Sequence, residues 1–144
     1  MTYGWVILVL IVALVVMWQW GLFNLSSSVD PGSFGFWGLV ITDGTEFQLI
    51  QNGLLRVSVL NTVGANVSLL YYNATYNGVS VDCGACAEQV IEPGENVIVS
   101  LQSSNWASRP RTRYEVHLLL RYNDSRTGDH IYQSSGTLWG NVEL

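Results

Sequence analysis

Residues 5–18 read WVILVLIVALVVMW, and every residue of this stretch is apolar. Gln19 is the only strongly polar residue between Trp5 and Trp20, and no charged residue appears before Asp30. The apolar residues form no stripe, so a helix here would be apolar on every side and would need lipid or other helices around it. Residues 1–23, as a helix rising ~1.5 Å per residue, would span roughly 33 Å, about the thickness of a bilayer's hydrocarbon core. We therefore expect a long hydrophobic α-helix over residues 1–23.

A secretory signal peptide is the other interpretation of this beginning. The apolar run is too long for one, no positively charged segment precedes it, and no small-x-small cleavage site follows it. Residues 24–33 are rich in serine, contain Asp30-Pro31-Gly32 and have the composition of a linker. We expect the apolar segment to stay attached to a second domain over residues 34–144.

From residue 34 onwards the hydrophobic pattern alternates with a period of two, which indicates β-strands. Asn52-Gly53 separates two such stretches and is a strong hairpin signal. The predicted strands are Phe34–Ile41, Glu46–Gln51, Leu54–Leu60, Asn66–Tyr72, Tyr76–Val81, a stretch around residues 97–101, Thr112–Tyr122 and Ile131–Trp139. The predicted fold class is α+β: a long N-terminal helix followed by an antiparallel β-sandwich of seven or eight strands, immunoglobulin-like in architecture.

The alternation also predicts which side chains face the core of the sandwich. The residues expected inside are Leu55, Val57, Val59, Val67, Leu69, Tyr71, Tyr114, Val116, Leu118 and Leu120. The residues expected outside are Arg56, Ser58, Arg113, Glu115, His117 and Arg121.

The two cysteines lie close together in the sequence Cys83-Gly84-Ala85-Cys86. A local disulfide is the simplest interpretation for an exported protein. A metal site would need a second pair of ligands, and a thioredoxin-like site would need a βαβ unit; the sequence has neither pattern. We expect a structural disulfide that stabilises the fold by roughly 2 kcal/mol.

The charges are sparse. The chain has a net charge of −5, no lysine and six arginines, three of them at Arg109, Arg111 and Arg113. Such a chain is not a candidate for nucleic-acid binding, which needs many phosphate-neutralising cations. No fixed spacing links His117 and His130 to each other or to a carboxylate, and no phosphate loop or nucleophile elbow is present. We expect a protein that is not an enzyme and has no catalytic site, metal site or cofactor other than N-linked glycans.

Four stretches match the N-glycosylation pattern Asn-x-Ser/Thr, and they begin at Asn24, Asn66, Asn73 and Asn123. Together with the absence of lysine and the predicted disulfide, they favour an exported glycoprotein. Asn73 and Asn123 are the strongest candidates because they lie in or beside predicted turns. Asn66 is weaker because it begins a predicted strand, and Asn24 because it follows the helix closely.

The N-terminal residues Met1-Thr2-Tyr3-Gly4-Trp5, with residues 6–9 after them and Gly21-Leu22-Phe23 at the end, resemble the N-terminal segment of archaeal type IV pilin-like proteins. In that family such a stretch follows a short class III signal peptide and opens the hydrophobic helix. Residues 130–140 are similar to the last strand of such proteins. The resemblance implies helices packed into a filament core with β-rich domains outside. Archaellins share this architecture.

The apolar helix and this resemblance predict a pilin, a structural subunit of an extracellular helical filament on the cell surface, used for adhesion or surface attachment. Its partners would be identical copies, and the helix would lie in the cytoplasmic membrane before assembly. The helix residues expected to mediate polymerisation are Trp5, Val9, Val12, Val16, Trp18 and Trp20; the tryptophans would pack between neighbouring helices or form an interfacial belt. The alternatives are an archaellum subunit used in motility and a non-polymerising, membrane-anchored binding domain.

Overall fold

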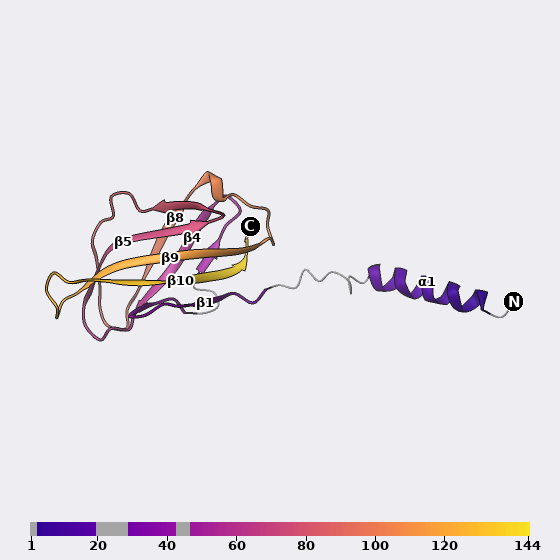
Figure 1. Cartoon of the computed structure of the whole chain (residues 1–144), viewed down its shortest axis with the longest axis horizontal. Helices are drawn as coiled ribbons and strands as arrows, with labels where there is room; N and C mark the ends of the chain where they lie inside the picture. Colours follow the sequence, from indigo (N-terminus) through magenta and orange to yellow (C-terminus); the bar gives the residue numbers. More distant parts are fainter. Residues whose placement is uncertain (1–2, 20–28, 43–46) are drawn as a thin grey trace.

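The computed structural model describes residues 3–19, 29–42 and 47–144 (Figure 1). Its α-helix, α1, covers Gly4–Gln19, which is 16 residues. Within the described ranges, no helix has both the length and the apolar character needed to cross a membrane.

The predicted α+β class with a long helix over residues 1–23 is wrong. The protein is mainly β: apart from α1, the regular structure of the described residues consists of ten strands and a single 3-10 turn. A continuous apolar run indicates that a helix forms but contains no signal for its exact ends, and the described helix covers 16 residues where 23 were expected. Residues 20–23 of the predicted helix lie outside the described residues.

The strands form two sheets in which every strand pairing is antiparallel, as predicted. The larger sheet has the order β1 (Gly32–Phe34), β10 (Ile131–Asn141), β9 (Arg113–Asp124), β5 (Val67–Tyr76) and β6 (Val79–Asp82), and β7 (Gln89–Ile91) also pairs with β5. The smaller sheet has the order β2 (Leu39–Val40), β4 (Leu54–Asn61) and β3 (Phe47–Leu49), and β8 (Asn96–Gln102) pairs with β4. In Figure 1, β5, β9 and β10 are the long strands of the larger sheet.

One hydrophobic core holds the two sheets together, and its residues come from both of them. The predicted inward residues of β4 and β9 are all buried: Leu55, Val57, Val59, Tyr114, Val116, Leu118 and Leu120. Ser58, predicted outside, is also buried, and Asn96 of the neighbouring strand donates a hydrogen bond from Nδ2 to Ser58 Oγ at 3.0 Å.

Glycines break one predicted strand into two. The predicted strand Phe34–Ile41 overlaps the end of β1, at Phe34, in the larger sheet and contains all of β2 in the smaller sheet. Gly35 and Gly38, between them, have φ angles of +99° and +78°, a region that side chains with a Cβ atom rarely adopt. The chain therefore crosses from one sheet to the other at this point.

Two further predictions fail for local reasons. The predicted strand Tyr76–Val81 is a hairpin, because Asn77 (φ 49°) and Gly78 (φ 77°) form a tight turn between β5 and β6. Tyr71, predicted inside, lies beyond a β-bulge between Leu69 and Tyr71. The extra residue turns the Tyr71 ring outward, where it lies 5.5 Å from the guanidinium carbon of Arg121.

Candidate functional site

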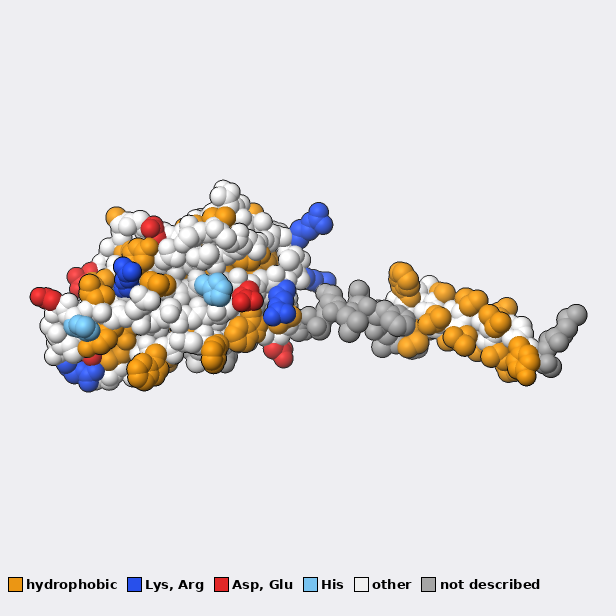
Figure 2. Space-filling view, viewed as in Figure 1, with side chains coloured by type: hydrophobic (Ala, Val, Ile, Leu, Met, Phe, Trp, Pro, Cys, Tyr) orange, Lys and Arg blue, Asp and Glu red, His pale blue; other side chains and the backbone are white. Residues whose placement is uncertain are grey.

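The helix α1 is apolar around its whole circumference. Its residues 5–18 are all apolar, and none of its side chains is buried. The predicted polymerisation residues in it are exposed: Trp5 68%, Val9 55%, Val12 53%, Val16 36% and Trp18 79%. Trp20 lies outside the described residues. In the view of Figure 2, hydrophobic side chains extend along the visible face of α1.

The predicted polymerisation residues occupy two sides of α1. At ~100° per residue, Trp5, Val9, Val12 and Val16 follow the spacing i, i+4, i+7, i+11 and share one face, whereas Trp18 lies on the opposite face. Beside Trp18 runs a shallow groove of about 250 Å³, also lined by Ile11, Leu14, Val15 and Gln19. Contacts with other molecules are therefore available on every side of the helix.

The predicted disulfide is confirmed. Cys83 and Cys86 are bonded, with their Cα atoms 5.3 Å apart, and they close the loop between β6 and β7. The N–H group of Gly84 donates to Asp82 Oδ1 at 2.9 Å inside this loop, and Cys83 packs against the core. The bond therefore fastens a surface loop to the edge of the larger sheet.

We expect a Cys83→Ser, Cys86→Ser double variant to lose roughly 2 kcal/mol of unfolding free energy, because the short ring no longer restricts the unfolded chain. Denaturant unfolding, compared with that of the oxidised wild-type protein, measures this loss, and the reduced wild-type protein should unfold like the variant.

The sequons lie in different surroundings. Asn24 lies outside the described residues. Asn66 precedes β5, is exposed and has no side-chain hydrogen bond to any described residue. Asn73, predicted in or beside a turn, lies inside β5, where Ser80 Oγ donates to its Oδ1 at 3.0 Å and its own Nδ2 donates to Tyr71 Oη at 3.4 Å. Asn123, near the end of β9, donates from Nδ2 to the carbonyl oxygen of Gly128. Asn66 is therefore the most accessible of the three described acceptors.

The two histidines contact different partners. His117 Nδ1 and Thr137 Oγ1 are 2.9 Å apart on the exposed face of the larger sheet. His130 contacts the ring of Tyr132 edge to face, with the ring centres 4.6 Å apart. Within the part of the chain that the structure describes, no three His, Cys, Asp or Glu residues come together as a metal site would require.

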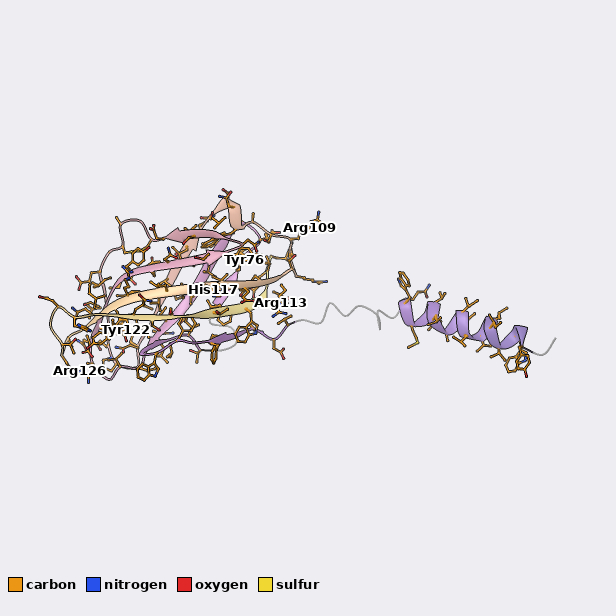
Figure 3. The ribbon with its side chains drawn as sticks, viewed as in Figure 1. Tyr76, Arg109, Arg113, His117, Tyr122 and Arg126 are labelled. Atoms are coloured by element: carbon orange, nitrogen blue, oxygen red, sulfur yellow. A yellow bond between two sulfur atoms is a disulfide. The ribbon has the colours of Figure 1, made fainter. Side chains whose placement is uncertain are left out.

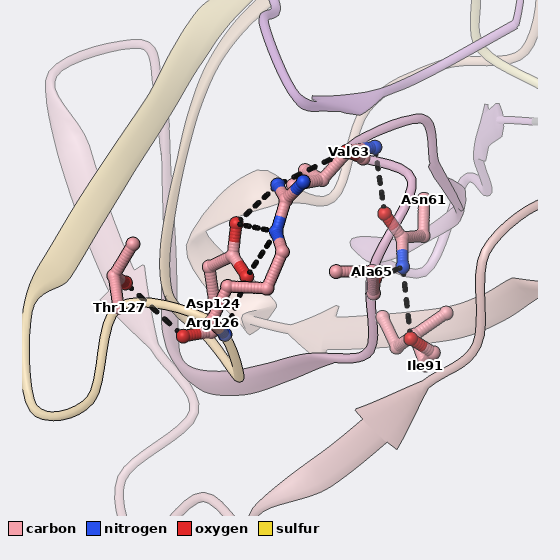
Figure 4. Close-up of polar contacts among 7 residues, drawn as sticks. All are labelled: Asn61, Val63, Ala65, Ile91, Asp124, Arg126 and Thr127. Carbon is pink, nitrogen blue, oxygen red and sulfur yellow. Dashed lines mark hydrogen bonds and ion pairs between the residues drawn. The ribbon is translucent and has the colours of Figure 1, made fainter.

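One ion pair organises the turn after β9 (Figure 4). Asp124 is 4% exposed, and its carboxylate accepts hydrogen bonds from the backbone N–H, Nε and Nη2 of Arg126. These bonds from Arg126 lower the pKa of Asp124 below its ordinary value of 3.8, and the same pairing raises the pKa of Arg126. This pair is not among the features expected from the sequence, although an acidic and a basic residue two positions apart in a polar turn are a visible signal for it.

This lowered pKa predicts an acid-dependent loss of stability. A carboxyl whose pKa is lower in the folded state stabilises the fold above its unfolded pKa, and this contribution disappears as the pH falls through the folded pKa. An Asp124→Asn variant should be less stable than the wild-type protein at pH 7, and the difference should shrink below about pH 3.8. Thermal unfolding of both proteins at a series of pH values measures the difference; a constant difference down to pH 2 would contradict the prediction.

No protein-family model matches this chain, and no curated protein matches it. The features of the molecule itself therefore provide the basis for a functional proposal.

Proposed function

We propose that this protein is a pilin: a structural subunit of an extracellular helical filament of the archaeal type IV pilus kind, which polymerises through α1 with identical copies of itself. The observation that supports this most is that α1 is apolar on every side and has no buried side chain. Burying apolar surface is favourable by ~25 cal/mol per Å², so α1 gains most where neighbours surround it completely. The core of a helical filament offers such surroundings.

The independence of the β-domain from α1 supports the same proposal. Its core is complete without α1, because none of the residues of the described helix belongs to it. A domain that needs no contact with α1 for its own stability can be displayed outside the filament. The resemblance of residues 1–5 to archaeal pilin-like proteins agrees with this division of roles.

The surface of the β-domain suits an extracellular position. Of the described sequons, Asn66 is exposed and Asn73 and Asn123 are half-buried, so an attached glycan would point away from the core. The disulfide is of the kind that persists in oxidising surroundings. Adhesion is the role we assign to the displayed domains.

Electron cryo-microscopy of material sheared from the cell surface without detergent tests the proposal. We expect filaments whose density fits this sequence, with the helices at the centre and extra density for a glycan first at Asn66. Single copies found only in detergent extracts of membranes would contradict the proposal and support an anchored domain.

The attachment and swimming of a strain that lacks the gene distinguish a pilus subunit from an archaellum subunit. We expect it to attach poorly to surfaces and to swim normally. Loss of swimming with normal attachment would instead support a subunit of the archaellum.

A further inference from the structure

A groove of about 540 Å³ lies at the end of the β-domain beside the turn between β9 and β10. Its lining combines aromatic and polar side chains of several segments, among them Trp37, Thr62, Val63, Tyr122, Arg126 and Tyr132. Figure 3 places Tyr122 and Arg126 together at this end of the domain, with Arg109 and Arg113 at the opposite end. Its volume falls within the roughly 300–1,000 Å³ of small-molecule sites.

Trp37 is 86% exposed, yet the backbone around it is held firmly. Its N–H group donates to Ser134 Oγ at 3.0 Å, and the Ser134 hydroxyl donates to the carbonyl oxygen of Leu39 at 2.8 Å. The N–H group and the hydroxyl of Thr62 both donate to the carbonyl oxygen of Gly38, at 2.9 and 2.8 Å. The indole ring is therefore presented to solvent by a fixed segment.

Further aromatic rings lie in and beside the groove. Tyr122 and Tyr132 stack with ring centres 5.7 Å apart and planes at 24°, and His130 packs edge-on against Tyr132. The Tyr122 hydroxyl lies so close to Gly38 that a Cβ atom there would collide with it. Burial, and then the carboxylate of Asp124, raise the pKa of Tyr122, so its hydroxyl keeps its proton at neutral pH.

The polar part of the groove is also preformed. Arg126 bonds to Asp124 through Nε and Nη2, and Nη2 also donates to the carbonyl oxygen of Val63 at 3.3 Å. The N–H group of Val63 is held in turn by Asn61 Oδ1 at 2.9 Å (Figure 4). Arg126 Nη1 has no hydrogen-bond partner among the described residues, and the Arg126 side chain is 58% exposed. The groove thus offers a fixed N–H donor group whose charge is already balanced.

We propose that this groove binds a neutral oligosaccharide. A pyranose ring has one face made mainly of C–H groups and an edge of hydroxyls, so its apolar face can pack on the Trp37 indole while hydroxyl oxygens accept hydrogen bonds from Arg126 Nη1. A nucleic acid does not fit, because a single guanidinium that is already paired cannot neutralise a phosphate backbone. The inference concerns the β-domain alone and holds whether or not α1 polymerises.

The test uses the full chain, produced in a bacterium without N-glycosylation, because glycans on the protein itself would compete for the groove. A polyoxyethylene detergent covers α1, since maltoside and glucoside detergents carry the very class of ligand under study. Maltotriose, cellotriose, mannotriose and chitotriose are titrated separately, and binding is followed by calorimetry. At least one should bind with a Kd near or below ~1 mM.

The variants Trp37→Ala and Phe34→Ala form a matched pair. Phe34 is 78% exposed, comparable to Trp37, but does not line the groove. We expect Trp37→Ala to weaken sugar binding at least ~10-fold and Phe34→Ala to leave it unchanged, with both variants melting near the wild-type temperature.

Several outcomes would overturn the proposal: no binding of any of these trisaccharides, unchanged binding by Trp37→Ala, or the same loss in both variants. Filament formation tests the remaining explanation, in which the groove is a contact between copies of the chain. If Trp37→Ala prevents assembly and Phe34→Ala does not, the groove is a contact between copies of the chain, and the carbohydrate proposal fails.

Discussion

A Val12→Asp variant is expected to form no filaments, while its β-domain stays folded. Val12 lies in the middle of α1 and is 53% exposed in the single chain, so in the proposed filament it would contact neighbouring helices. A carboxylate there would be buried without a partner, which costs several kcal/mol. The cost recurs at every subunit, so the polymer loses its advantage over the free chain. Electron microscopy of sheared material measures the loss of filaments.

Two further variants sharpen this test. Val12→Leu keeps the side chain apolar and should assemble normally, which controls for the exchange itself. Leu14→Arg places a charge about 200° around the helix from Val12, on nearly the opposite side, and should also abolish filaments. Normal filaments from either charged variant would contradict burial on every side of α1. Circular dichroism of each variant establishes that the β-domain is folded.

The β-domain was largely predictable wherever a strand alternates regularly. In β9 every second side chain, from Tyr114 to Leu120, is buried, and the side chains between them face outward. The reason is geometric: a paired strand has a side-chain period of two, so one buried face determines the positions of all its residues. The Asn52-Gly53 turn between β3 and β4 was predictable for a different local reason: hairpin turns favour Asn-Gly because they need positive φ angles, and Gly53 has a φ angle of +79°.

Failures occurred where a single residue interrupts the period. The bulge before Tyr71 reverses which face of the sheet each later residue of β5 occupies. The residue types at that position do not predict a bulge. The turn at Asn77-Gly78 was visible as an asparagine-glycine pair but was placed inside a strand. Gly35 and Gly38 also stood in the sequence, yet their effect depends on which sheet each half of the segment joins.

The groove at Trp37 could not be predicted from the sequence. Its residues come from β2 and the segment before it, the residues that follow β4, the end of β9, the turn after β9 and the start of β10. Only the crossing of the chain between the two sheets brings Trp37 near Tyr132 and Arg126. An exposed tryptophan also has the same sequence signature as a buried one, so its role depends entirely on its surroundings.

Trp106 illustrates the opposite case, and its replacement is expected to have the largest effect on stability. It ends the 3-10 turn η1 (Ser104–Trp106), directly after the polar residues Ser103-Ser104-Asn105, and nevertheless is 0% exposed. Its indole Nε1 donates to the carbonyl oxygen of Val79 in β6 at 3.1 Å, which links the connection after β8 to the edge of the larger sheet. A Trp106→Ala variant should lose about 3–5 kcal/mol of unfolding free energy, because a large cavity opens in the core.

Two controls separate the causes of that loss. Trp106→Phe retains most of the buried volume but leaves the Val79 carbonyl without its donor, so it should lose about 1–3 kcal/mol. Trp37→Ala removes an indole that is 86% exposed and should change the unfolding free energy by less than about 0.5 kcal/mol. Denaturant unfolding at equilibrium measures all three. A loss at Trp106→Ala no larger than at Trp37→Ala would mean that η1 is not part of the cooperative core. We expect the lowest unfolding free energy for Trp106→Ala, an intermediate value for Trp106→Phe and a value near that of the wild-type protein for Trp37→Ala. This order follows because the burial of an indole, rather than its residue type, determines what it contributes to stability.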